Sequence, residues 1–137
     1  MNPILRNILA VIAGVIAGMF ANMSLIMISG SVVALPEGVN PNDVNSIKEH
    51  LHLYEAKHFI MPFLAHAMGS FIGALVTALI AASHKMKFAI GLGIWTMVGG
   101  IAAAYLIPAP TWFIVVDLTL AYIPFAFVAG KIAESKS

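Results

Sequence analysis

The chain has 137 residues, of which 61% are hydrophobic and only 9% are charged, and its net charge at pH 7 is +1. Soluble domains carry about 25% charged residues, so this composition excludes a soluble domain and indicates a membrane protein. No cysteine is present, which excludes disulfides, thiolate metal sites and thiol nucleophiles. The seven Lys and Arg residues form no basic run, so nucleic acid is not an expected partner.

The first apolar segment covers about residues 4–29 and follows a short start that contains Arg6. A signal peptide has an apolar core of only about 7–15 residues, so this longer segment predicts a retained membrane helix. The next stretch, LPEGVNPND at residues 35–43, predicts a loop because it holds two prolines and a glycine.

Residues 31–57 form a polar outer loop whose second half has helical periodicity. Apolar and aromatic residues recur there at steps of three and four, and predict an amphipathic helix along the membrane surface: Val44, Ile47, Leu51, Tyr54 and His58. Asn42 or Asp43 is the expected N-cap of this helix.

Three further apolar segments follow, at about residues 59–82, 88–107 and 111–130. The turns between them are SHKMK at 83–87 and PAP at 108–110. Each segment is near the length of about 20 residues that a membrane-spanning helix needs. The sequence therefore predicts an all-α protein with a single transmembrane domain over residues 1–137. Four transmembrane helices would form an antiparallel bundle, with the extra interfacial helix between the first and second spans.

Basic residues near the helix ends predict the orientation, because cytoplasmic loops are enriched in Lys and Arg. One side of the predicted bundle holds five basic residues: Arg6, Lys85, Lys87, Lys131 and Lys136. The other side holds two, Lys48 and Lys57, among four acidic residues. Both termini are therefore expected in the cytoplasm, with residues 31–57 outside.

Small residues recur on one face of each of the four predicted spans. They are Ala10, Gly14 and Gly18, Gly69 and Gly73, Gly93, Gly100 and Ala104, and Ala126 and Gly130. Lipid tails are as apolar as leucine, so membrane helices associate where small residues let their backbones approach closely. The rows indicate a tight bundle that could extend into an oligomer. The alternative is that glycine is simply common in membrane helices.

Three polar residues interrupt the spans at similar depth. Asn22, His66 and Asp117 lie roughly 9–12 Å below the predicted outer surface at 1.5 Å per residue. Ser70 shares the helix face of His66. Ionisable groups in the bilayer cost about 2.5–3.5 kcal/mol on insertion scales, so they usually face inward and have partners. We therefore expect a buried polar cluster of these four residues.

Two interpretations of this cluster remain open. In one it is a polar clamp between helices, without a ligand. In the other it is a proton- or cation-responsive site, in which Asp117 holds the imidazole of His66 by a hydrogen bond and histidine changes charge near neutral pH.

The outer loop contains a candidate metal site in EHLHLYEAKH: His50, His52, Glu55 and His58. Imidazole and carboxylate ligands suit zinc, copper or nickel. However, His50 and His52 are two residues apart and would point to different faces of a helix. The alternative is an interfacial helix without metal.

No other cofactor is expected. Haem would need a second ligand such as Met23 or Met97 beside His66, the one histidine within a span. No serine elbow or phosphate-cradling loop is present, so no catalytic residue is assigned and an enzyme is not expected.

The segments KHFIMPFLAHAMGSFIGALVTALIAASHKMKFA and PAPTWFIVVDLTLAYIP resemble small uncharacterised four-helix membrane proteins of bacteria. That resemblance covers nearly the whole chain and implies the bacterial inner membrane, but no activity and no functional residue. The chain is also near the size of small multidrug-resistance transporters, yet it lacks their membrane-embedded glutamate in the first span.

The leading hypothesis from the sequence is a non-enzymatic inner-membrane protein that packs into a homo-oligomer or joins other membrane subunits. Its polar cluster would then be structural. The second hypothesis is a small transporter or channel for a proton, cation or small solute, using Asp117 and His66. The third is a metal-binding membrane protein that uses the outer histidines.

Overall fold

The computed structural model describes residues 1–137 and contains helices only. In chain order they are α1 (Pro3–Val32), α2 (Val44–His50), the 3-10 helices η1 (Leu51–Leu53) and η2 (Ala56–Phe59), α3 (Ile60–Ile80), α4 (Lys85–Leu106), α5 (Thr111–Leu120) and α6 (Ile123–Ser135). Four stretches are long and apolar enough to cross a membrane: Pro3–Val32, Ala56–Ile80, Lys85–Leu106 and Thr111–Ser135. The predicted all-α class and the four candidate spans are confirmed.

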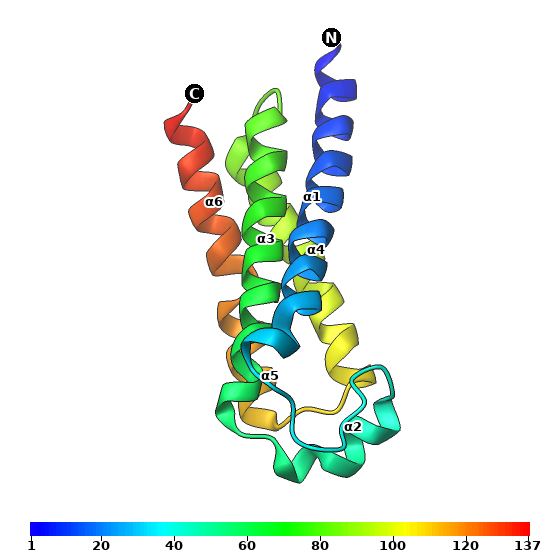
Figure 1. Ribbon diagram of the computed structural model, residues 1–137. Helices are drawn as coiled ribbons and strands as arrows, with labels where there is room; N and C mark the ends of the chain where they lie inside the picture. Colours follow the sequence, from blue (N-terminus) through cyan, green and yellow to red (C-terminus); the bar gives the residue numbers. More distant parts are fainter.

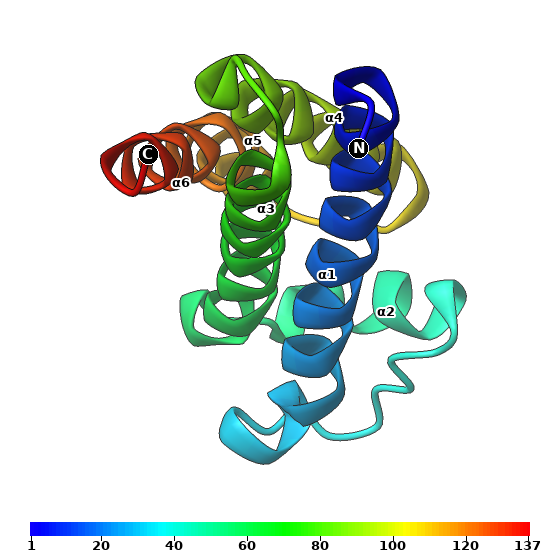
Figure 2. The same cartoon turned by 90° about the horizontal axis from the view of Figure 1, so that it is seen from above.

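Helix α3 occupies the middle of the molecule and packs against α1, α4 and α6 (Figure 1). Both termini lie at one end of the molecule, and the segment containing α2 lies at the opposite end. Helix α1 contacts α3 along its length and touches α4 only slightly. In Figures 1 and 2, α1 and α4 diverge toward their C-terminal ends. The bundle is therefore closed around α3, α4 and α6, and open between α1 and α4.

Small side chains form the core between α3, α4 and α6. The core cluster contains Ala74, Ala78, Ala89, Leu92, Ala126, Ala129 and Ala133, and six of its seven members are alanine. Alanine brings helix backbones close, so dispersion contacts between the helices are maximised where hydrophobicity supplies no driving force.

The contact between α1 and α3 is made by glycine backbones. A Cβ atom added to Gly18 would lie 2.7 Å from the carbonyl oxygen of Gly69, and one added to Gly73 would lie 3.0 Å from that of Gly14. Gly14 also leaves room for the side chain of Thr77. Any larger residue on this face would push the two helices apart.

The fourth span differs from the prediction, because it is broken between α5 and α6 at Ala121 and Tyr122. Pro124 explains the break: it lacks an N–H group, and its ring displaces the carbonyl group four residues earlier. Both residues at the break are buried, at 0% and 2% exposure. Irregular backbone at membrane depth is tolerated where protein covers it.

The outer segment also differs from the prediction, because residues 44–58 do not form one amphipathic helix. Helix α2 begins after Asp43, whose carboxylate accepts a hydrogen bond from the N–H of Asn45 at 3.0 Å, as an N-cap does. The backbone is then extended at Tyr54 and Glu55. Glu55 forms a capping box with His58, which starts the new helix η2. The three–four periodicity of the sequence is therefore not one continuous helix.

Replacing Gly18 with alanine tests the glycine contact. We expect Gly18→Ala to lower the free energy of unfolding by about 1–3 kcal/mol, because the methyl group would overpack against the α3 backbone. Thermal unfolding in detergent micelles measures the change. Gly30→Ala, on the same helix with nothing within 4 Å, is the matched control and should leave stability unchanged or slightly higher. Equal effects of the two substitutions would contradict this packing.

Candidate functional site

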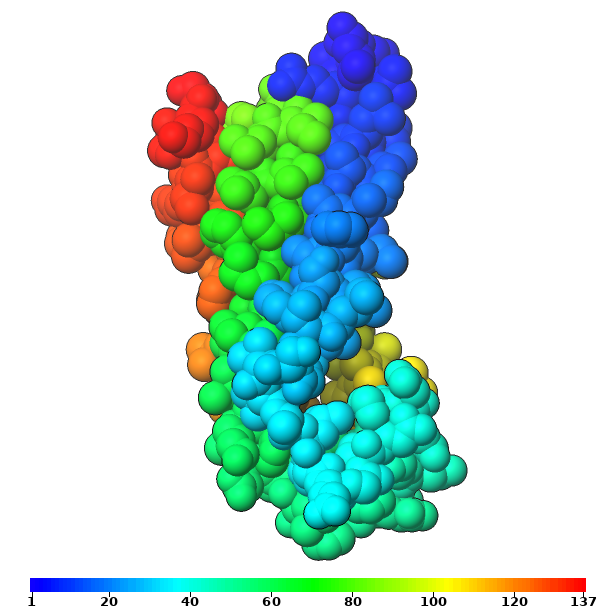
Figure 3. Space-filling view, in the orientation of Figure 1, coloured from blue at the N-terminus to red at the C-terminus, as the bar shows by residue number.

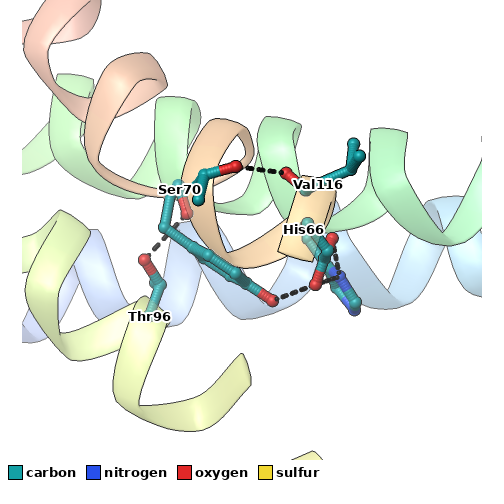
Figure 4. A network of polar contacts seen from close by, with 7 residues as sticks. His66, Ser70, Thr96 and Val116 are labelled. Atoms are coloured by element: carbon teal, nitrogen blue, oxygen red, sulfur yellow. Dashed lines mark hydrogen bonds and ion pairs between the residues drawn. The ribbon is translucent and has the colours of Figure 1, made fainter. Parts of the chain in front are cut away.

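His66 and Asp117 form the centre of the candidate site. His66 lies on α3 and Asp117 on α5, and the Nδ1 atom of His66 is 2.8 Å from Oδ1 and 3.0 Å from Oδ2 of Asp117 (Figure 4). The side chain of Asp117 is 7% exposed and that of His66 is 24% exposed. The structure therefore brings together two of the four residues that the sequence places in the cluster.

Tyr122 completes the group and was not anticipated from the sequence. Its hydroxyl donates a hydrogen bond to Oδ2 of Asp117 at 3.0 Å. Its ring stacks beside the imidazole of His66, with 5.7 Å between ring centroids and 23° between ring planes. In an unbroken helix, residues five apart would point about 140° away from each other. The break in the fourth span is what allows Tyr122 to reach Asp117.

Gly100 on α4 makes room for the tyrosine. A Cβ atom at Gly100 would overlap the phenol ring of Tyr122. The sequence signal that could have revealed Tyr122 is Pro124, a helix-breaking residue in the middle of an apolar span.

The hydrogen bonds define which atoms of the site remain free. When Asp117 is ionised its carboxylate is an acceptor only, and the Nδ1 atom of His66 is then the donor in the bond between them. In the neutral imidazole, Nε2 is then an acceptor with a free lone pair. No hydrogen bond occupies Nε2 in the structure. This atom can take up a proton, accept a hydrogen bond or bind a cation.

His66 lines a cavity of about 430 Å³ between α1, α3 and α4. Its polar wall contains Asn22, Ser70, Thr96 and Tyr122, and the rest is largely glycine and apolar side chains. The molecular surface is also hollowed at the C-terminal end of α1, where the end of α4 is visible behind it (Figure 3). The cavity lies between the two helices that diverge toward that end.

Ser70 and Asn22 line this cavity without bonding to the His66–Asp117 pair. The hydroxyl of Ser70 is 2.7 Å from that of Thr96, which in turn donates to the carbonyl oxygens of Leu92 and Gly93. The hydrogen bond between Ser70 and Thr96 links α3 to α4 (Figure 4). Asn22 lies over Gly69, and no hydrogen bond joins its amide to His66 or Asp117.

The outer histidines do not form the metal site that their spacing suggests. No group of three His, Cys, Asp or Glu residues lies close enough to hold a metal ion. The Nδ1 atom of His50 bonds to the carbonyl oxygen of Ser46 at 2.7 Å, and that of His58 accepts the N–H of Glu55 at 2.8 Å. His52 makes no such contact and is exposed. The extended backbone at Tyr54 and Glu55 places His50 and His52 on a different helical segment from His58.

No protein-family model matches this chain, and no curated protein or solved structure is similar to it. A helical bundle alone hosts many functions, so the geometry and chemistry of the site are what bear on the function of this protein.

Removing the hydroxyl of Tyr122 tests the hydrogen bond to Asp117. We expect Tyr122→Phe to lower the free energy of unfolding by about 0.6 kcal/mol, the mean found for hydrogen bonds between membrane helices, and by no more than about 1.7 kcal/mol, the maximum. Tyr105→Phe makes the same chemical change at a residue that is 88% exposed, and it should have no effect. Both are measured by thermal unfolding in one detergent, and a Tyr122→Phe protein as stable as the Tyr105→Phe protein would refute the bond.

Proposed function

We propose that this chain is an integral membrane protein that binds a proton or small cation at His66 and moves it across the bilayer, as a small transporter or channel. It would not convert that ion chemically. The observation that carries the proposal is the position of the imidazole: Asp117 fixes Nδ1, and the free Nε2 belongs to a residue that lines an intramembrane cavity.

The charge around the cavity favours a cation. None of the 18 lining residues is Lys, Arg, Asp or Glu, so no basic side chain neutralises Asp117 from that side. With a neutral imidazole, the ionised carboxylate would leave the group at −1 in a medium of low dielectric constant, where Coulomb attraction is strong. A proton on Nε2, or a cation beside it, would balance that charge.

The broken fourth span leaves backbone carbonyl oxygens without partners. Pro124 cannot donate to the carbonyl oxygen of Leu120, and no backbone hydrogen bond from Tyr122 or Ile123 reaches Leu118 or Thr119. Discontinuous membrane helices in transporters use such unpaired carbonyl oxygens to coordinate ions. The fourth span shares this feature with them, at residues that lie outside the lining of the cavity at His66.

A polar clamp is the competing explanation for the same residues. A clamp between α3 and α5 requires only the bond from His66 to Asp117. It does not explain why Nε2 of His66 is unpaired at a cavity. This feature favours the ion-binding interpretation.

Ion flux into proteoliposomes tests this function. We expect vesicles with the protein to pass protons faster than empty vesicles, measured with entrapped pyranine under an imposed pH gradient. Sodium, potassium and methylammonium are measured in parallel. His66→Gln and Asp117→Asn should each reduce the flux at least about tenfold, the scale set by about 1.4 kcal/mol of lost interaction.

His52→Gln is the matched control for that test, because it removes an exposed histidine of the outer segment. It should retain the full rate. Variants of His66 and Asp117 that melt earlier but carry ions at the wild-type rate would establish the clamp instead. Flux equal to that of empty vesicles for all four ions would exclude the proposed function.

Assembly with further copies or other membrane subunits is the second candidate function. It is supported by α1, which fully buries only Ala10, Gly14 and Gly18 and exposes the apolar side chains of its outer face. Large apolar side chains on the uncovered face include Ile16 at 62% and Phe20 at 77% exposure. Van der Waals packing of such a face against another helix is one way that membrane helices associate.

Light scattering in mild detergent tests assembly. We expect a protein mass of at least two chains of 14.5 kDa each. Phe20→Ala on α1 should shift the mass toward one chain, whereas Phe127→Ala, an exposed phenylalanine on α6, should not. A wild-type mass of one chain, or an equal shift in both variants, would count against an α1 interface.

We also propose that the protein resides in the inner membrane of a bacterium with both termini in the cytoplasm. Support comes from the excess of Lys and Arg at the end of the molecule where the termini lie (Figure 1).

A further inference from the structure

A second hollow lies at the opposite end of the molecule from α2, where α1 meets the turn between α3 and α4. Two residues of α1 reach this turn. The amide oxygen of Asn7 accepts the N–H of Ala82 at 2.8 Å, and the Nε atom of Arg6 donates to the carbonyl oxygen of Ile80 at 2.5 Å. These bonds fix the turn against α1 and orient the two side chains.

The hollow has a volume of about 360 Å³ and is lined by Asn7, His84, Lys87 and Phe88. The free polar atoms of these four side chains are mostly hydrogen-bond donors. The Nδ2 atom of Asn7 and the Nζ atom of Lys87 are donors only, and Nε2 of His84 donates in one tautomer and when protonated. None of these three atoms has a hydrogen-bond partner in the structure.

No acidic side chain forms an ion pair or a hydrogen bond with these donors. The two ion pairs of the chain are Lys57–Glu55 and His66–Asp117, so Lys87 is unpaired. Lys85, beside the hollow, donates to the carbonyl oxygens of Ala78 and Leu79 and adds a second positive charge. A site with hydrogen-bond donors and positive charge, and without a carboxylate, suits an oxyanion.

The backbone of His84 is held in an unusual conformation at this site. Its φ of 53° makes it the one residue other than glycine with a positive φ. The Nδ1 atom of His84 is 3.0 Å from the hydroxyl oxygen of Ser83, and this contact orients the imidazole.

The apolar side chains next to the hollow favour a lipid as the source of the oxyanion. The hollow lies at the ends of two candidate spans, and Phe88 forms an apolar wall. Ile4 and Ile8 of the adjoining part of α1 are exposed at 71% and 52%. Donors next to exposed apolar side chains match a molecule with a phosphate head and acyl chains, and basic pockets between membrane helices bind such head groups.

We propose that Asn7, His84 and Lys87 bind the phosphate of an anionic membrane lipid, with its acyl chains beside Phe88 and α1. This site is distinct from the cavity at His66, since the two share no lining residue. The lipid would hold the N-terminal part of α1 against the α3–α4 turn.

Thermal unfolding with added lipid tests the proposal. The purified protein in a neutral detergent is titrated with phosphatidylglycerol, phosphatidylcholine or inorganic phosphate. We expect phosphatidylglycerol alone to raise the melting temperature in a saturable way. Lys87→Gln should raise the half-saturating lipid concentration about fivefold, the effect of one lysine near an anionic surface.

Two further variants keep the outcome specific. Lys131→Gln removes one positive charge from α6, outside the hollow, and should leave the titration unchanged. His84→Gly removes the imidazole while suiting the left-handed backbone, so it should fold and still bind the lipid more weakly. The proposal is overturned if Lys131→Gln weakens binding as much as Lys87→Gln, or if phosphatidylcholine stabilises equally. It is also overturned if inorganic phosphate reproduces the effect, which would leave a phosphate-ion site.

Discussion

A carboxylate within a membrane-spanning segment must have hydrogen-bond donors, and Asp117 is the residue on which this structure depends. Burying a charge without partners costs far more than one domain can supply, so the chain has to bring donors to it. His66 supplies one from α3 and Tyr122 supplies the other from the far side of a helix break. The break needs Pro124, and the tyrosine needs the space at Gly100. One carboxylate thus accounts for features on three helices.

The small residues serve a second purpose besides close packing. Where alanine lines both partners, as between α3, α4 and α6, the helices close without a gap. Glycine residues of α1 and α3 face each other, so α1 lies close to α3 and touches α4 only slightly. The cavity beside His66 is the space that remains. Packing and the candidate site are therefore two results of how glycine and alanine are distributed.

The sequence predicted those parts of the structure that follow from local pattern. Hydropathy located the four spans because the bilayer fixes their length and composition. The rise per residue placed His66 and Asp117 at one depth, and the structure has them in contact. Tyr122 was missed because helical geometry was extended through a proline, which is where regular periodicity fails. The prediction of one helix over residues 44–58 was wrong for a similar reason. Glu55 caps a new helix within this stretch, and a three–four spacing of apolar residues does not reveal where one helix ends and the next begins.

The length of α1 has a consequence for the cavity. Thirty helical residues extend about 45 Å, whereas the hydrocarbon core of a bilayer is about 30 Å thick, so a helix of this length can span it with some tilt. Helix α1 forms one wall of the cavity, and its seam with α3 is made of backbone atoms without interlocking side chains. A thicker bilayer would bring α1 closer to upright, and the gap between its C-terminal half and α4 would change with it. We therefore expect the width of the cavity beside His66 to depend on the thickness of the surrounding membrane.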